Sequence, residues 1–419
     1  MNTAKRFVTR LTAVTLAVGV CFLSSCTPKK IDIEEYPGFE PTEETSTENP
    51  DVKEDIPNED YVEYPGGMTD KEFADFIAIP DPFEETDKFH FCYKAIPEYY
   101  ARQYREKPQI IYVAKEMMEA VYNGQMEFDI PPENELNGEE IFLAESLAKM
   151  SCPLVESCSI GYSEDDPLKY YVTYCSKVVI TDSAYDSEGN LVVENMSFSN
   201  LDEDEAIKYV NDFSDYISSL IDRNVSAEDS DMEKAAKIYS ALTKEISYRE
   251  RRDVEDKQFY DSEADFWESL AEQTFLVEDI INDKATTQPR LALLYQYILT
   301  QLNIECMTVS SSGAYHSQDI EKLDKEMGTR GRNIWNVVVV DGKAYNCDLA
   351  YEILTYEYDK SMSAGVEPQM KYFGMSDSTR SQSFTVSDRS SIYYYNPNPW
   401  EEESGPKNMV PECVSDYKH

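Results

Sequence analysis

The stretch from Asn333 to Asp348 constrains the fold of this chain more than any other segment. It contains two apolar runs separated by Asp341-Gly342, and that dipeptide between two strand-like runs is a strong signal for a tight β-hairpin turn. A helical pattern from Pro289 to Asn303 and an apolar strand pattern over 304–309 precede the hairpin. The sequence therefore predicts a helix packed on an antiparallel sheet in this part of the chain.

The region before residue 230 predicts a separate unit of mixed structure. Helical patterns start at Thr69, at Pro108 and at Glu139, and strand patterns follow them. The predicted strands cover 155–162, 168–182 and 191–197, and a long amphipathic helix containing Ala206, Val210, Phe213, Ile217 and Ile221 comes next. A chain of 419 residues is long for one domain. We therefore predict an α+β protein with an N-terminal helical and β-meander domain over 68–229, a second domain over 230–385, and a Tyr- and Pro-rich tail over 386–419.

The first 25 residues have the pattern of an export signal. Lys5, Arg6 and Arg10 precede an apolar stretch that is too short to span a membrane. The stretch ends in Leu23-Ser24-Ser25-Cys26, which looks like a bacterial lipobox. This pattern predicts a lipid on Cys26 and an extracytoplasmic protein anchored to the outer face of the cell membrane. The alternative is a simple secretory signal that happens to end in a cysteine.

The charge of the chain excludes one class of partner. Acidic residues outnumber basic residues by 81 to 38, which gives a formal net charge of −43. Such a charge repels phosphate backbones, so nucleic acid is not expected as a partner. We interpret most of this acidity as solvated surface. Residues 26–67 are acidic and rich in proline, and we predict that they form a tether between the lipid and the folded part.

Histidine and cysteine usage argues against a metal site or a cofactor. The chain has three histidines and no Cys-x-x-Cys pair, so no zinc site can be assembled at standard spacing. Seven cysteines remain besides Cys21 and Cys26, and an odd number leaves at least one thiol unpaired within the chain. The sequence assigns no disulfide pairing and no oligomeric state.

Residues 230–385 resemble the bacterial transglutaminase-like superfamily. The resemblance rests on the order helix, strand, hairpin and on four short motifs, Asn303-Ile304-Glu305-Cys306, Ile334-Trp335-Asn336-Val337, Asp341-Gly342-Lys343 and Asp348. It implies a papain-like fold with a Cys-His-Asp triad. In that family the cysteine starts the helix, the histidine precedes the Trp-Asn pair, and the aspartate follows the hairpin.

Two of the three triad positions are substituted in this chain. The nucleophile position falls on Thr287 or Gln288, the histidine position holds Asn333, and only Asp348 matches the family. An amide side chain cannot serve as a general base near neutral pH, and glutamine cannot attack a carbonyl. The resemblance therefore implies a pseudoenzyme that acts as a binding or scaffolding module, with a peptide or cell-wall ligand as its partner.

The expected binding residues follow from the same positions. They are Thr287, Gln288, Arg290, Asn333, Trp335, Asp348 and Tyr351. We expect the side chains of Asn333 and Asp348 to approach within about 4 Å, with Gln288 or Thr287 close by, because the ancestral chemistry required hydrogen bonds at these positions.

Two other interpretations remain open at this point. An active acyltransferase or peptidase with a displaced nucleophile would have to use Cys306, Cys347 or His316, although both cysteines fit small buried residues better. The aromatic cluster from Tyr393 to Trp400 suits a glycan or peptide surface, or else a tail that packs back on the domain.

Overall fold

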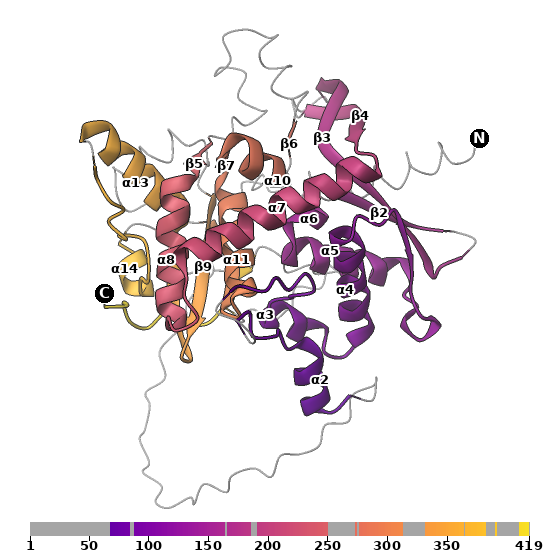
Figure 1. Cartoon of the computed structure of the whole chain (residues 1–419), viewed down its shortest axis with the longest axis horizontal. Coiled ribbons are helices and arrows are strands. Elements are labelled where there is room, and N and C mark those ends of the chain that lie inside the picture. The colour runs from indigo at the N-terminus through magenta and orange to yellow at the C-terminus, as the bar shows by residue number, and fades with distance from the viewer. Residues whose placement is uncertain are drawn as a thin grey trace, which may run out of the picture. The chain divides into compact units, whose positions relative to one another are not determined.

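The computed structural model describes residues 68–83, 88–163, 166–185, 191–249, 273–274, 276–312, 332–363, 365–382, 390–391 and 410–418 (Figure 1). Residues 72–419 form one compact unit. The unit mixes helices with small antiparallel sheets, which confirms the α+β class. Within the described residues, no helix is both long enough and apolar enough to cross a membrane.

The N-terminal part of the unit is mainly helical. Its elements are α2 (Asp70–Ile77), α3 (Glu98–Ala101), η1 (Arg102–Tyr104), α4 (Pro108–Tyr122), β1 (Glu127–Asp129), η2 (Pro132–Asn134), α5 (Gly138–Ser151) and α6 (Pro153–Glu156). Proline in the first turn of α4 and Gly124 at φ +67° after its end mark the helix as predicted. Asn137 caps α5 and forms a capping box with Glu140.

The first sheet has the β-meander that the sequence predicts. Its long strand β3 (Lys169–Tyr185) pairs antiparallel with β1, with β2 (Cys158–Tyr162), with β4 (Leu191–Asn200) and with β6 (Gln273–Thr274). The predicted strand over 155–162 is wrong at its start. Pro153 begins the helical turn α6 instead, because its fixed φ suits the first position of a helix.

Two amphipathic helices follow this sheet and connect it to the second half of the unit. These are α7 (Glu203–Asn224) and α8 (Asp231–Glu245), which pack on each other, and α8 packs on α11 (Gln288–Gln301; Figure 1). Each of the first two begins with a capping box, formed by Asp202 with Glu205 and by Ser230 with Glu233. The second of these boxes was predicted from the sequence.

The second sheet contains the predicted hairpin. Its strands are β8 (Glu305–Ser312), β9 (Arg332–Val340), β10 (Lys343–Cys347) and β11 (Ser390–Ser391), in the order β10-β9-β8-β11. Asp341 and Gly342 have φ of +50° and +70°, as the tight turn between β9 and β10 requires. Asn303, at φ +57°, lies between α11 and β8. The predicted order of helix, strand and hairpin is confirmed.

Smaller elements surround this sheet. They are β5 (Ser247–Tyr248), α10 (Leu276–Glu278), η4 (Asp279–Asp283), β7 (Ala285–Thr286), α13 (Leu349–Met362) and α14 (Asp377–Arg380). Strands β5 and β7 form a short parallel pair. The α11 and α13 helices pack on each other, and α13 also packs on α8. These contacts join α8, α11 and α13 into one packed group, and α11 also packs on β8 and β9.

Helix α11 lies at the centre of the unit. Twelve of its 14 residues are buried. The side chain of Gln296 accepts hydrogen bonds from the Tyr100 hydroxyl at 2.9 Å and from the backbone of Thr308 at 2.8 Å, and it donates to the Met150 carbonyl at 3.0 Å. The predicted domain boundary near residue 229 stays a prediction. The hydrogen bonds of Gln296 join residues that precede this boundary, Tyr100 and Met150, to Thr308, which follows it.

The C-terminal segment 410–418 packs on the same unit. The backbone of Asp377 donates to the Cys413 carbonyl at 2.7 Å, and the backbone of Tyr417 donates to the Gly374 carbonyl at 2.8 Å. The ring of Tyr417 makes edge contacts with Tyr345 and Phe373. The end of the predicted tail is therefore held against the hairpin. The aromatic cluster from Tyr393 to Trp400 lies outside the described residues.

Candidate functional site

Asp348, the triad position that matches the family, lies between β10 and α13. It is the N-cap residue of α13, and its fully buried carboxylate accepts a hydrogen bond from the backbone N–H of Tyr351 at 3.3 Å. The Nη1 atom of Arg380 donates to the other carboxylate oxygen at 3.1 Å. The Tyr239 hydroxyl donates to the backbone carbonyl of Asp348 at 2.8 Å. The carboxylate therefore serves as a helix cap and as one half of a buried ion pair.

Arg380 comes from the short helix α14 and is also fully buried. Its guanidinium carbon lies 3.8 Å from the centre of the Trp335 ring, which is close enough for a strong cation–π contact. The indole N–H of Trp335 donates to the side-chain oxygen of Asn346 at 2.8 Å, and Asn346 donates to Asp377 at 2.9 Å. These side chains form a continuous network, buried except at Asp377, which we call the Asp348 cluster.

The charges of the Asp348 cluster are enclosed by protein. Burial raises the pKa of Asp348, and the nearby guanidinium of Arg380 opposes that rise. Burial likewise lowers the pKa of Arg380, and Asp348 opposes that change. Each charge is thus costly on its own and is compensated by its partner. We expect the pair to remain ionised and fixed in place near neutral pH.

Thr287 and Gln288, the two candidate nucleophile positions, lie at the start of α11. Thr287 is the N-cap residue and makes no side-chain capping hydrogen bond, while Gln288 is the first helical residue and is buried. Asn336 donates from the sheet to the Ala292 carbonyl of α11 at 2.9 Å. Because side chains alternate along a strand, the neighbouring Trp335 points to the opposite face of the sheet. Trp335 therefore contacts Arg380 on the face away from α11.

The predicted approach of Asn333 to Asp348 stays a prediction. The backbone of Asn333 pairs in register with Ser311, and its side chain lies outside the described residues. The structure brings Trp335, Asp348 and Tyr351 into one region, since the backbone N–H of Tyr351 donates to Asp348, and Trp335 and Asp348 both contact Arg380. Arg380 itself was not singled out from the sequence.

Arg290 belongs to another cluster of charges. Its Nη1 atom donates to Asp279 at 2.9 Å, and Asp279 also accepts from Arg249 and from the Thr286 hydroxyl, both at 2.8 Å. Asp279 is buried at the start of η4. These residues, which we call the Asp279 cluster, tie α11 to β7, to η4 and to the residue that follows β5. The role of Arg290 as a ligand-binding residue stays a prediction.

The cysteines considered as displaced nucleophiles are enclosed in the core. Cys306 and Cys347 are fully buried, which confirms the prediction that they are small core residues. Burial raises the pKa of the Cys347 thiol to about 12 and raises the pKa of Cys306 well above its ordinary value. A thiol with such a pKa is almost entirely protonated near neutral pH and is a poor nucleophile. His316 and the predicted lipid attachment site, Cys26, lie outside the described residues.

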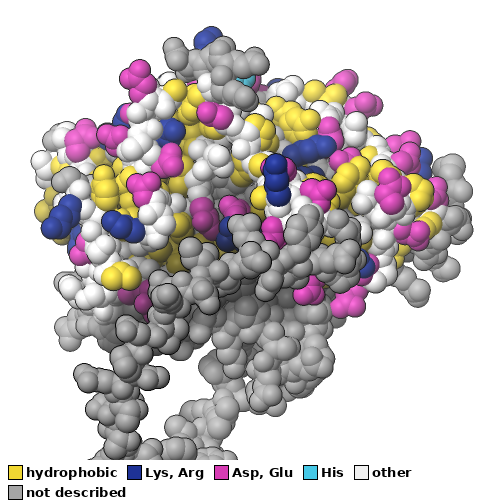
Figure 2. All heavy atoms as spheres, turned by 90° about the horizontal axis from the view of Figure 1, so that it is seen from below, with side chains coloured by type: hydrophobic (Ala, Val, Ile, Leu, Met, Phe, Trp, Pro, Cys, Tyr) yellow, Lys and Arg dark blue, Asp and Glu magenta, His cyan; other side chains and the backbone are white. Residues whose placement is uncertain are grey.

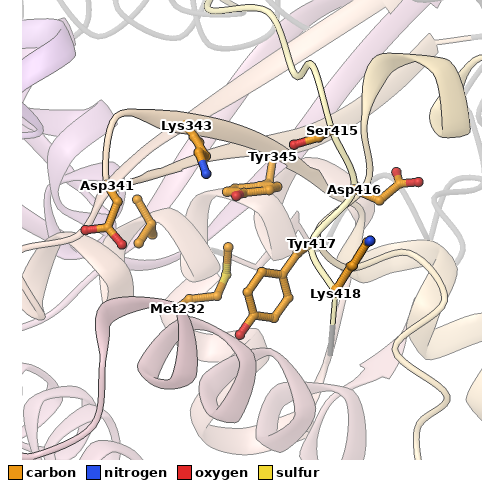
Figure 3. A pocket seen from close by; sticks show the side chains of 9 residues that line it. Met232, Asp341, Lys343, Tyr345, Ser415, Asp416, Tyr417 and Lys418 are labelled. Atoms are coloured by element: carbon orange, nitrogen blue, oxygen red, sulfur yellow. The ribbon is translucent and has the colours of Figure 1, made fainter.

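A pocket of about 360 Å³ lies on another part of the hairpin (Figure 3). The turn of the hairpin contributes Asp341, strand β10 contributes Lys343 and Tyr345, and the C-terminal segment contributes Tyr417 and Lys418. Met232 from α8 closes one side. In the sequence, Asp341-Gly342-Lys343 indicates a turn and contributes to the family resemblance, but nothing local indicates that residues 410–418 return to this hairpin.

Searches for similarity add no relative. Neither the family models nor the curated proteins with which the chain was compared give a match. Within the part of the chain that the structure describes, there is also no group of three or more His, Cys, Asp and Glu side chains that could hold a metal ion.

Proposed function

We propose that the chain is a bacterial cell-surface lipoprotein, anchored through Cys26, whose transglutaminase-like domain is degenerate and acts as a binding or scaffolding module in the envelope. The observation that carries the proposal is the ion pair between Asp348 and Arg380. A triad aspartate must orient a histidine, and here the carboxylate is occupied by a guanidinium and by a helix N–H instead.

The order of elements supports the family part of the proposal. Helix α11 precedes β8 and the hairpin of β9 and β10, and Asp348 follows the hairpin directly. This is the order on which the resemblance rests. The finer assignment of residues 68–229 as a helical and β-meander domain, and of 230–385 as a papain-like domain, belongs to the same proposal.

The chemistry of the substituted positions supports a binding role rather than turnover. Amide side chains at 288 and 333 can donate and accept hydrogen bonds but cannot supply a nucleophile or a base. The buried thiols of Cys306 and Cys347, with their raised pKa values, weaken the alternative of a displaced nucleophile. The surface charge fits a soluble envelope protein: on the face in Figure 2, acidic and basic side chains are interspersed among apolar ones.

An activity assay tests the pseudoenzyme part of the proposal. The purified full chain should neither hydrolyse peptides nor incorporate a labelled amine into a glutamine-bearing acceptor above the buffer blank, while an active transglutaminase assayed in parallel should do so. Turnover that is abolished by Cys306→Ala, Cys347→Ala or His316→Ala would overturn the proposal in favour of an active enzyme.

A fractionation experiment tests the anchor separately. In a bacterial host, the wild-type chain should partition with the detergent-soluble membrane fraction. The variant Cys26→Ser should appear in the medium or remain as an uncleaved precursor, because it lacks the sulfur that takes the lipid. Cys21→Ser is the matched control and should partition like the wild-type chain. A Cys26→Ser protein that is still lipid-modified would show that the anchor is assigned to the wrong residue.

A further inference from the structure

The pocket beside the hairpin turn combines two lysine side chains with two tyrosine rings. Lys343 and Lys418 both line it, and neither forms an ion pair within the part of the chain that the structure describes. In Figure 3 the two lysines lie on either side of the Tyr345 and Tyr417 rings. Uncompensated ammonium groups next to aromatic rings form a site for an anion that carries an apolar body.

The two acidic side chains of the pocket, Asp341 and Asp416, differ in their hydrogen bonds to the rest of the protein. Asp416 is committed to the protein, since one carboxylate oxygen accepts from the backbone of Ser376 at 2.6 Å and the other accepts from the Thr379 hydroxyl at 2.8 Å. These bonds lower the pKa of Asp416 and keep it ionised. In Figure 3 its carboxylate points away from the rings. Asp341 is exposed at the turn.

The charged groups of the pocket differ in their freedom to bind a ligand. Two ammonium groups, from Lys343 and Lys418, and two carboxylates, from Asp341 and Asp416, line the pocket, so its formal charges balance, but the Asp416 carboxylate already accepts hydrogen bonds from Ser376 and Thr379. The apolar part of the lining comes from Met232, Tyr345 and the ring of Tyr417. A volume of about 360 Å³ lies at the small end of the range for ligand pockets and suits one amino-acid-sized group.

We propose that this pocket binds an organic carboxylate with an apolar or aromatic body, of the size of the C-terminal residue of a peptide. The carboxylate would lie between the ammonium groups of Lys343 and Lys418, and the body would lie against the Tyr345 and Tyr417 rings. The site is separate from the Asp348 cluster, so it stands whether or not the domain is a degenerate transglutaminase.

The edges of the pocket explain how the site is held. Strand β10 fixes Lys343 and Tyr345 through its pairing with β9, where Lys343 is opposite Val340 and Tyr345 is opposite Val338. The C-terminal segment is fixed by the bonds of Asp416 and by the hydrogen bond from Tyr417 to Gly374. Two segments far apart in the sequence are therefore preorganised around one space, which reduces the entropic cost of binding.

Three small molecules test the proposal on the full chain by titration calorimetry or NMR. N-acetyl-phenylalanine has both the carboxylate and the body, its amide lacks the charge, and acetate lacks the body. We expect N-acetyl-phenylalanine to bind with a Kd of about 1 mM or below. The amide and acetate should each bind at least about tenfold more weakly. A tripeptide ending in phenylalanine should bind at least as well as the single residue if a peptide terminus is the natural source.

Variants locate the binding on the pocket. Lys343→Gln and Lys418→Gln should each weaken N-acetyl-phenylalanine about five- to tenfold, because each removes one ammonium partner. Asp341→Asn should strengthen it, since a repelling carboxylate is lost. Lys208→Gln on α7 is the matched control and should leave Kd unchanged. Both lysines of the pocket are exposed, so an unchanged melting temperature will show that the variants fold. Equal binding of the amide, an effect of Lys208→Gln equal to that of Lys343→Gln, or no binding at about 10 mM would overturn the proposal.

Discussion

Two buried carboxylates, Asp348 and Asp279, are held in different ways. Among the described residues, Asp348 pairs with the guanidinium of Arg380, and both members of the pair are fully buried. Asp279 contacts the guanidinium groups of both Arg249 and Arg290 in the same part of the chain, and these side chains are 36% and 24% exposed. A second partner with access to water makes the Asp279 cluster tolerant of a single loss. The Asp348 cluster has no such reserve, so its arginine is the more critical residue for stability.

Replacing Arg380 should produce the largest effect. Arg380→Met removes the cation that pairs with Asp348 in the described part of the chain and should lower the free energy of unfolding by about 3–5 kcal/mol, because a buried charge is left uncompensated. Urea denaturation followed by circular dichroism measures this change. Arg223→Met is the matched control, since Arg223 forms an exposed ion pair with Glu245, and its cost should be about 0–1 kcal/mol. Equal losses for the two variants would remove the distinction.

The loss of one arginine from the Asp279 cluster should cost less. Arg290→Met leaves Arg249 and the Thr286 hydroxyl on the carboxylate and should lower the free energy of unfolding by about 1–2 kcal/mol. The double variant with Arg249→Met should reach about 3–5 kcal/mol, because the buried carboxylate of Asp279 then loses both of its described guanidinium contacts. If Arg290→Met alone lowered the free energy of unfolding as much as Arg380→Met, the second arginine at Asp279 would not explain the difference between the two clusters.

The sequence predicted the local elements of these two regions well, but it did not predict which charged residues pair with each other. The capping box at Ser230, the helix that ends before Asn303 and the Asp341-Gly342 turn all depend on neighbouring residues, and the sequence shows those directly. The partner of Asp348 lies 32 residues away on a four-residue helix. A helix that short has no periodic pattern, so Arg380 could not be recognised.

The return of the C-terminal segment was hidden for a similar reason. Asp416 accepts from the backbone N–H of Ser376, 40 residues away, and only the folded chain brings Lys418 and Lys343 into one pocket. The sequence could indicate that a tail packs on the domain, but not where it does so. Arg290 shows the opposite case: it was singled out by its alignment position, while its contacts with Asp279 depend on η4.

The dependence of stability on pH sharpens the comparison. Without Arg380, the pKa of Asp348 in the folded state should rise further above its unfolded value of about 3.9, because burial is then opposed only by the hydrogen bond from the Tyr351 backbone N–H. The penalty for the ionised carboxylate is complete above the folded pKa and disappears as pH falls through it. The cost of Arg380→Met should therefore be largest near neutral pH and smaller in mild acid. An unchanged cost across that range would contradict the assigned partner.

The smallest expected effect is a difference in the order in which the cysteines react with a thiol reagent. Cys306 and Cys347 are fully buried with raised pKa values, whereas Cys92 is only partly buried. In the native protein, a maleimide should label Cys92 before either of the other two, and all three should react in denaturant. Mass mapping of labelled peptides measures the order. Early labelling of Cys306 or Cys347 would favour the displaced-nucleophile alternative.

A double-mutant cycle between Asp348→Asn and Arg380→Met tests the central claim most directly, namely that the aspartate of the resembled triad is committed to Arg380. Unfolding free energies of the wild type, the two single variants and the double variant give the coupling energy. We predict a coupling of about 2–3 kcal/mol, with the double variant more stable than Arg380→Met alone. Losses that add to within about 0.5 kcal/mol would show that Asp348 and Arg380 act independently and would leave the carboxylate available for another partner.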